Sequence, residues 1–256
     1  MIDVSHLNKR IQRRGVLHDI TLHVSSGTVA GLSGPNGSGK TMLMRMVVGL
    51  MRPTSGSVLV NGCNPWAHTA GLAPQNTPTK SEKTKEGHEI QARSQSAWPA
   101  IGLLLEGPAF LDNRTGYDNL KILADVKGLH ADDAVQEALE SVGLDPDDRR
   151  RYRAYSLGMR QRLGIAGAIL GGPQILILDE PTNALDDTGV ELVIGLVHRA
   201  AERGTAVMLA CHDSDVLRTL SHEIWHMNEG RVTRHDILKP GPAPACHAQS
   251  QEGETR

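Results

Sequence analysis

Apolar residues follow two different patterns along this chain, and together they predict a mixed α/β fold. Residues 2–7 and 16–24 alternate between apolar and polar positions, as in Ile-Thr-Leu-His-Val over residues 20–24, which is typical of strands with one buried face. Residues 29–32 and 175–178 are apolar at nearly every position instead. Such runs are typical of a parallel sheet that is covered on both faces.

Helical periods lie between these strands. Apolar residues recur at helical intervals over residues 119–129 and 132–142, which predicts two helices in a small helical subdomain spanning about 107–158. Ser156 is a favourable N-cap for a further helix, which the Gly-Gly-Pro sequence at residues 171–173 would end.

Three stretches lack a regular period. The basic residues 9–14 lie between the first two strands and are interpreted as a hairpin connection. Residues 67–97 are rich in Pro, Lys, Glu and Gln and predict a mobile surface insertion, either a solvated loop or a contact surface for a partner. The tail over residues 239–256 is expected to be disordered, which leaves residues 1–238 as the folded domain.

Composition narrows the function. A formal net charge of -2 over 256 residues argues against a bulk nucleic-acid surface or a polybasic membrane anchor. The three cysteines have no metal-ligand spacing, and scattered thiols fit a reducing cytoplasm. No apolar run approaches the roughly 18–20 residues of a membrane-spanning helix. The N-terminus also lacks the pattern of a secretion signal. A cytoplasmic location is therefore expected.

A glycine-rich loop follows the apolar run 29–32 and precedes a helical pattern. Its spacing, Gly-x-x-x-x-Gly-Lys-Thr, predicts a phosphate-binding loop, because glycines let successive backbone N–H groups surround a polyphosphate. The lysine would bind the β- and γ-phosphates of a nucleoside triphosphate, and the threonine hydroxyl would bind Mg²⁺. The predicted loop residues are Gly34, Pro35, Asn36, Gly37, Ser38, Gly39, Lys40 and Thr41.

Two carboxylates end the apolar run 175–178. Asp179 and Glu180 would lie at the carboxyl end of a buried strand, which is where parallel-sheet proteins bind ligands. Asp179 would bind Mg²⁺ directly or through water, and Glu180 would orient or deprotonate the water that attacks the triphosphate.

With these motifs in place, residues 1–235 resemble the ATP-binding subunits of ABC transporters. The chain has Tyr-Ser-Leu-Gly-Met-Arg-Gln-Arg over residues 155–162, where that family carries its signature, and Asp-Glu-Pro-Thr-Asn-Ala-Leu-Asp over residues 179–186. His212 follows the next strand. The resemblance implies a P-loop NTPase core with a mostly parallel sheet, an N-terminal antiparallel β subdomain and a small inserted helical subdomain.

The resemblance also implies how the site works. Two subunits would pack head to tail around two ATP molecules, with Ser156 and Gly158 of one subunit facing the γ-phosphate bound by the other. His212 would contact the γ-phosphate and help to position the attacking water. Asp186 would couple the two sites across the interface.

Three departures from the usual family pattern refine this expectation. Leu157 and Met159 replace a glycine and a glutamine of the signature, and Glu106 stands where most members have a glutamine. Glu106 can still bind Mg²⁺ or its waters, and these features resemble the ATPases of lantibiotic and bacitracin exporters. Ile11 stands where an aromatic ring usually stacks on adenine, which predicts modest nucleotide affinity and weak adenine preference.

The resemblance therefore implies an ATP-hydrolysing subunit, with ATP and Mg²⁺ as ligands, that powers export of a peptide antibiotic, lantibiotic or drug. Its expected partners are an integral membrane permease and a second ATPase subunit, giving a homodimer, with a heterodimer as the alternative, on the inner face of the membrane. Two alternatives stay open: a soluble ABC ATPase acting on nucleic acid or ribosomes, and a peptide-sensing or immunity complex without net transport. The lack of a basic face and of coiled-coil heptads argues against a nucleic-acid partner.

Overall fold

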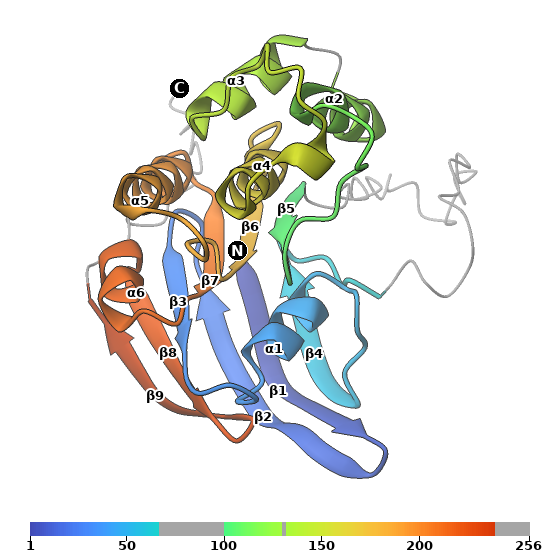
Figure 1. The fold of residues 1–256 in the computed structure, drawn as a ribbon. Coiled ribbons are helices and arrows are strands. Elements are labelled where there is room, and N and C mark those ends of the chain that lie inside the picture. The colour runs from blue at the N-terminus through green and yellow to red at the C-terminus, as the bar shows by residue number, and fades with distance from the viewer. Residues whose placement is uncertain (67–99, 130–131, 239–256) are drawn as a thin grey trace, which may run out of the picture.

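The computed structural model describes residues 1–66, 100–129 and 132–238. The predicted insertion at 67–97 and the predicted tail at 239–256 lie outside these ranges. Two sheets and a layer of helices make up the described part (Figure 1).

The smaller sheet is antiparallel and contains the N-terminal strands. Its order is β2-β1-β4, with β1 spanning Ile2–Ile11, β2 spanning Arg14–Val24 and β4 spanning Ser55–Val60. The prediction of a hairpin connection over residues 9–14 was wrong in extent, because only Gln12 and Arg13 lie between the strands, both with positive φ. Ile11 pairs with Arg14, since charged side chains on a solvated hairpin do not interrupt strand pairing.

The larger sheet carries the nucleotide-binding motifs. Its order is β5-β6-β7-β3-β8-β9, and all neighbouring strands are parallel except the β8–β9 hairpin. The strands span Ile101–Leu104 (β5), Ile175–Asp179 (β6), Ala206–Ala210 (β7), Val29–Ser33 (β3), Glu223–Asn228 (β8) and Arg231–Ile237 (β9). The mostly parallel sheet and the antiparallel N-terminal sheet confirm the predicted fold class.

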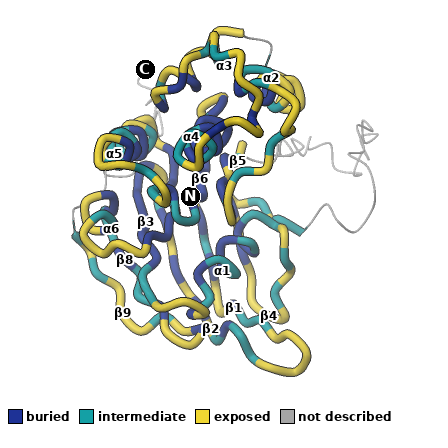
Figure 2. The backbone as a smooth tube through the Cα atoms, in the orientation of Figure 1, coloured by how far each residue is buried: buried dark blue, intermediate teal, exposed yellow. Residues whose placement is uncertain are grey.

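The large sheet is covered on both faces, which explains why its central strands are apolar throughout. Ile175 and Ile177 of β6 enter the core shared with the small sheet and α1, whereas Leu176 and Leu178 enter the core under the other helices. Figure 2 shows the central strands buried between these two layers. A strand whose successive side chains enter two cores cannot alternate with polar residues.

Helix α1 (Lys40–Val47) packs between the two sheets, and the remaining helices lie on the opposite face of the large sheet (Figure 1). These helices are α2 (Gly116–Val126), α3 (Asp132–Ser141), the short 3-10 helix η2 (Tyr152–Ala154), α4 (Leu157–Ile169), α5 (Asp187–Glu202) and α6 (Ser214–Leu220). Within the described ranges, no helix is long and apolar enough to span a bilayer.

Side-chain caps set where two of the helices begin. Ser156 caps α4 as predicted, with its Oγ accepting a hydrogen bond from the Met159 backbone N–H at 3.2 Å. Helix α2 begins at Gly116, three residues before the predicted start at residue 119, because Thr115 and Asp118 form a reciprocal capping box.

Candidate nucleotide-binding site

The phosphate loop connects β3 to α1, and two of its glycines are required by backbone geometry. Gly34 has φ 148°, and a Cβ there would lie 2.1 Å from the Met227 carbonyl oxygen of β8. Gly39 has φ 105° and immediately precedes α1. Because side chains are excluded at these positions, the loop lies directly against β8 and its helix begins at Lys40.

Lys40 is buried and its ammonium lies across the loop. The Nζ atom donates hydrogen bonds to the Gly34 carbonyl at 2.7 Å and to the Pro35 carbonyl at 3.2 Å. The N-terminal end of α1 adds the positive end of a helix dipole at the same point. These groups together favour a polyphosphate.

Thr41 and Asp179 come from distant parts of the sequence and meet at one edge of the sheet. The Thr41 hydroxyl donates a hydrogen bond to Asp179 Oδ2 at 2.7 Å. A hydroxyl and a carboxylate are oxygen ligands suited to Mg²⁺, which usually takes one or two protein ligands and completes its shell with phosphates and water. The donor set that the structure brings together therefore fits this ion.

Glu180 and His212 form a second pair at the same edge. Glu180 Oε2 accepts a hydrogen bond from the His212 backbone N–H at 3.1 Å, and His212 Nε2 lies 3.5 Å from Glu180 Oε1. Burial raises the pKa of the Glu180 carboxyl above its ordinary value, and the His212 backbone hydrogen bond opposes this shift. A carboxylate with a raised pKa is a stronger base toward water than an exposed one.

A cavity of about 880 Å³ joins these groups. Its size is within the range of ligand pockets, about 300–1,000 Å³. The predicted site residues that line this cavity are Asn36, Gly37, Ser38, Gly39, Lys40, Thr41, Glu106, Asp179, Glu180 and His212. The phosphate loop, both carboxylates at the end of β6 and the histidine after β7 therefore share one cavity.

Six predicted site residues lie outside this lining, and two of them, Gly34 and Pro35, belong to the phosphate loop, where their carbonyls accept hydrogen bonds from Lys40. Ile11 is 40% exposed on the β1–β2 hairpin, and Val16 of β2 lines the cavity instead. Ser156 and Gly158 lie at the N-terminal end of α4, and Asp186 caps α5, with Oδ1 accepting a hydrogen bond from Gly189 N–H at 3.0 Å. Within one chain these residues do not line the phosphate cavity.

Arg45 is a site residue that the sequence analysis missed. It lies on α1, one turn beyond Thr41, and its guanidinium forms an ion pair with the Glu106 carboxylate. Both residues line the cavity. Arg45 thus balances the negative charge that Glu106 introduces into this cavity.

We expect Arg45→Gln to weaken ATP binding about fivefold, because it leaves the Glu106 carboxylate unpaired near a polyanion, and partly exposed ion pairs contribute about 1 kcal/mol. Glu106→Gln should retain ATP binding but alter coupling to transport. The double variant should bind ATP within about twofold of the parent protein. Titration with a fluorescent ATP analogue measures all three affinities, and equal losses in Arg45→Gln and the double variant would contradict this charge balance.

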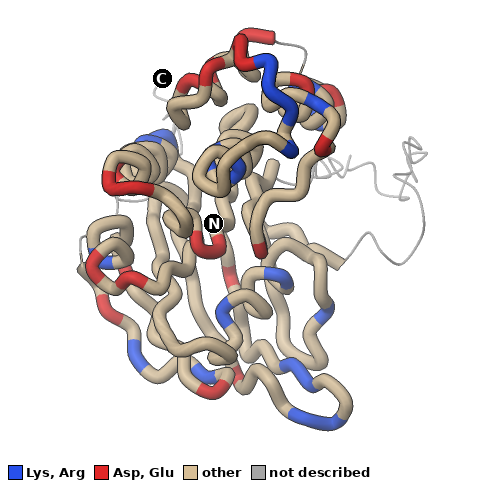
Figure 3. Tube along the Cα trace, in the orientation of Figure 1, with Lys and Arg blue, Asp and Glu red and all other residues tan. Residues whose placement is uncertain are grey.

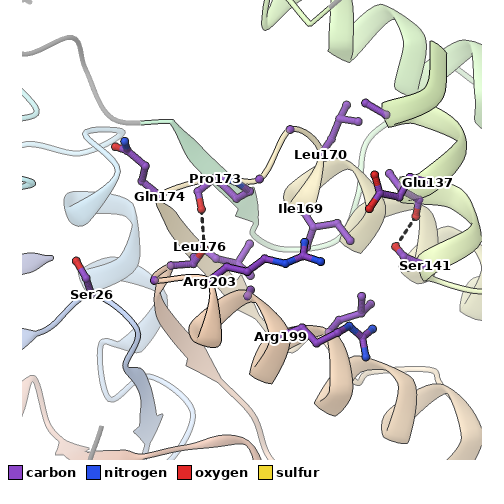
Figure 4. A pocket seen from close by; sticks show the side chains of 18 of the residues that line it. Ser26, Glu137, Ser141, Ile169, Leu170, Pro173, Gln174, Leu176, Arg199 and Arg203 are labelled. Atoms are coloured by element: carbon purple, nitrogen blue, oxygen red, sulfur yellow. Dashed lines mark hydrogen bonds between the residues drawn. The ribbon is translucent and has the colours of Figure 1, made fainter. Parts of the chain in front are cut away.

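A second cavity, of about 570 Å³, lies at the other edge of the large sheet. It is lined by residues that precede β6 and β7, including Gln174 and Thr205, and by Arg199 in the last turn of α5 and Arg203 directly after that helix (Figure 4). These arginines lie at the C-terminal end of α5, where the helix dipole stabilises cations. No described residue lines both cavities, so this cavity is separate from the phosphate site.

A doubly covered α/β sheet with a phosphate loop, paired carboxylates and a histidine at one edge defines a P-loop nucleotide-binding protein. Residues 17–183 match the family described as ABC transporter. The uncharacterized ABC transporter ATP-binding protein YdbJ of Bacillus subtilis is 40% identical over 233 residues, which cover 91% of this chain and 68% of that protein. The chain belongs to the ABC transporter family.

Relatives with named transport roles are also similar. The bacitracin transport ATP-binding protein BcrA of Enterococcus faecalis is 36% identical over 91% of this chain and 68% of that protein. The lantibiotic transport ATP-binding protein SrtF of Streptococcus pyogenes is 30% identical over 91% of this chain and 89% of that protein. A solved ATP binding subunit of an ABC transporter shares the fold, with a TM-score of 0.76 at 22% identity over 93% of this chain and 90% of that chain.

Proposed function

We propose that this protein is the ATP-hydrolysing subunit of an exporter that moves a peptide antibiotic, lantibiotic or drug through a separate integral membrane permease. The observation that carries the proposal is the single cavity that holds Lys40, Thr41, Asp179, Glu180 and His212. These side chains supply a phosphate-binding cation, two oxygen ligands for a metal, a base and a second polar group for the terminal phosphate.

In this mechanism the triphosphate lies along the loop and the N-terminal end of α1. Lys40 binds the β- and γ-phosphates. Its hydrogen bonds to loop carbonyls hold the ammonium in position for this contact. Thr41, Asp179 and Glu106 are the proposed protein ligands of Mg²⁺ or of its waters. When bound, Mg²⁺ neutralises charge that develops on the phosphates.

Glu180 orients the attacking water and accepts its proton, and His212 contacts the γ-phosphate on the same side. The hydrogen bond from the His212 backbone to Glu180 fixes the position of the carboxylate relative to the histidine. Hydrolysis breaks the bond between the β- and γ-phosphates, so that ADP and phosphate leave the site.

A second copy of the chain completes each site. Ser156 is exposed at the N-terminus of the 13-residue helix α4, whose dipole and N–H groups suit an anion, yet it does not line the phosphate cavity of its own chain. A head-to-tail homodimer places Ser156 and Gly158 of one subunit against the γ-phosphate held by the other. Asp186 then lies near the subunit interface.

The relatives support peptide antibiotics as the cargo class, because BcrA and SrtF are described as bacitracin and lantibiotic transport proteins. In this arrangement the permease holds the subunit on the inner face of the membrane. Figure 3 shows basic positions next to one another on the β1–β2 hairpin, and acidic and basic positions interspersed over other parts of the described backbone. A peptide-sensing or immunity complex without net transport is the second candidate, since it would use the same ATPase site.

Co-purification with a candidate membrane permease, followed by reconstitution in vesicles, tests the function. We expect bacitracin or a lantibiotic to stimulate ATP hydrolysis and ATP to drive peptide accumulation across the vesicle membrane. Stimulated hydrolysis without accumulation would favour the sensing complex. Absence of any hydrolysis by the reconstituted complex would refute the proposal.

Ile11 leads to a prediction about base preference. Because an aliphatic side chain cannot stack on the base as an aromatic ring does, we expect the isolated subunit to bind ATP and GTP with affinities within about fivefold, since a stacked base contributes roughly 1–3 kcal/mol. Ile11→Tyr should strengthen ATP binding, and Ile237→Tyr on β9 serves as the exposed aliphatic control. Strong ATP discrimination by the parent protein would contradict the prediction.

A further inference from the structure

Helix α4 lies along the chain segment that joins the proposed base to the next helix. This segment, residues 180–186, starts at Glu180 and ends at Asp186, the N-cap of α5. Three positions of α4 contact it at three successive points. The contacts connect the N-terminal end of α4, where Ser156 lies, to the subunit's own Glu180.

Gln161 makes the central contact. This residue is only 8% exposed, and its Nε2 donates hydrogen bonds to the Glu180 carbonyl at 2.8 Å and to the Pro181 carbonyl at 3.1 Å. Glu180 has φ 52°, a left-handed conformation that a residue with a side chain adopts only when its surroundings fix it. The two hydrogen bonds from Gln161 therefore hold the backbone that aims the Glu180 carboxylate.

Two further contacts extend along the segment. A Cβ at Gly158 would lie 3.0 Å from the Ala184 carbonyl oxygen, so the first turn of α4 packs closely on the segment. Arg162 Nη2 donates a hydrogen bond to Asp186 Oδ1 at 3.1 Å. Consecutive side chains of α4 thus bind both ends of residues 180–186.

We propose that Gln161 is a positioning residue for Glu180 of the same subunit, and that α4 transmits contact with the partner's nucleotide at Ser156 to this subunit's own hydrolysis site. Ser156 and Gln161 are five residues apart on one helix, about 7.5 Å along its axis, so a shift at one end moves the other. The inference rests on the proposed function, because it requires a nucleotide shared between two subunits. It also gives the coupling between the two sites a direction, from Ser156 at the N-terminal end of α4 to Glu180 of the same subunit.

Mixed dimers with one active site distinguish this role from a general effect on the signature helix. In the first dimer, a Glu180→Gln subunit pairs with a Gln161→Met subunit, so the remaining base has lost its own positioning amide. In the second, a subunit carrying both Glu180→Gln and Gln161→Met pairs with the parent subunit, so the remaining base keeps its amide. The reference is a dimer of Glu180→Gln with the parent subunit.

We expect kcat to fall about 10- to 100-fold below the reference in the first dimer, because misplacement of a reacting group by about 1 Å has effects of this size. The second dimer should stay within about threefold of the reference, and a fluorescent ATP analogue should bind the isolated Gln161→Met subunit with unchanged affinity. A lower kcat in the second dimer, with kcat of the first dimer equal to the reference, would overturn the proposal. An equal fall of kcat in both dimers would overturn it as well.

A matched control separates positioning from stability. Asn119 is also a buried amide, and its Nδ2 donates to the Leu111 and Thr115 carbonyls, away from residues 180–186. Asn119→Leu should lower the midpoint of thermal unfolding as Gln161→Met does, yet retain kcat in the same dimers. If Asn119→Leu lowered kcat equally, the Gln161 effect would be structural and the proposal would fail.

Arg162→Met provides an independent test if Gln161→Met does not fold. It removes the contact with Asp186, and we expect the Hill coefficient of ATP hydrolysis by the homodimer to fall from between 1 and 2 toward 1. Arg162→Lys should restore part of the cooperativity. If the parent protein hydrolyses ATP cooperatively and Arg162→Met has the same Hill coefficient, only this inference is overturned. A parent protein without ATP hydrolysis would overturn the proposed function itself.

Discussion

Replacing Glu180 by Gln should lower ATP turnover by about 10²- to 10⁴-fold, the usual contribution of a general base, while nucleotide binding persists. The amide keeps the size and most of the hydrogen-bonding geometry of the carboxylate but cannot accept the proton of the attacking water. Lys40, Thr41 and Asp179 remain to bind the triphosphate, so the variant should accumulate as an ATP-bound dimer. Phosphate release measures turnover, and size-exclusion chromatography with and without ATP measures dimerisation.

Glu202→Gln is the matched control for this experiment. Glu202 is an exposed glutamate at the C-terminal end of α5, away from the phosphate cavity, and its replacement should leave turnover and dimerisation unchanged. Normal turnover in Glu180→Gln would show that another group accepts the proton. A variant that neither turns over ATP nor dimerises with it would instead indicate that Glu180 contributes to binding.

The part of the site that the sequence predicted is the part that parallel-sheet geometry brings together. The phosphate loop follows β3, Asp179 and Glu180 end β6, and His212 follows β7, which lies between those two strands. Because the carboxyl ends of parallel strands meet at one edge of a sheet, motifs far apart in sequence were predictably close in space. The apolar run 175–178 identified a covered strand for a different reason, because its successive side chains enter the cores on both faces of the sheet.

The contacts that the sequence could not reveal are those without a local pattern. Gln161 lies between two arginines in a helix, and nothing in its neighbours indicates that its amide is buried against the Glu180 carbonyl. Arg45 meets Glu106 only because α1 and the end of β5 converge, across a separation of 61 positions in the chain. Polar groups in such positions follow tertiary packing and not the hydrophobic period, so only the assembled fold identifies them.

Replacing Lys40 by Met should weaken ATP binding about 100-fold and abolish hydrolysis at ordinary ATP concentrations. Hydrogen bonds to charged groups contribute about 1.5–3 kcal/mol, and the ammonium is expected to contact two phosphates, so the loss in affinity is large. Met retains the length and apolar stem of the side chain, which keeps the packing of the loop nearly unchanged. Isothermal titration with a slowly hydrolysed ATP analogue and Mg²⁺ measures the affinity.

Lys9→Met distinguishes loss of phosphate binding from loss of a structural hydrogen bond. Lys9 Nζ donates to the Arg52 carbonyl at 2.6 Å, much as Lys40 donates to loop carbonyls, but Lys9 does not line the phosphate cavity. Lys9→Met should therefore bind ATP normally, and both variants should unfold with similar midpoints. If Lys40→Met bound ATP as tightly as Lys9→Met, the phosphate loop would not be the triphosphate site, and the positions assigned to Thr41, Asp179 and Glu180 around it would lose their basis. This one comparison therefore tests the assumption on which the roles of the base, the metal ligands and the second subunit all depend.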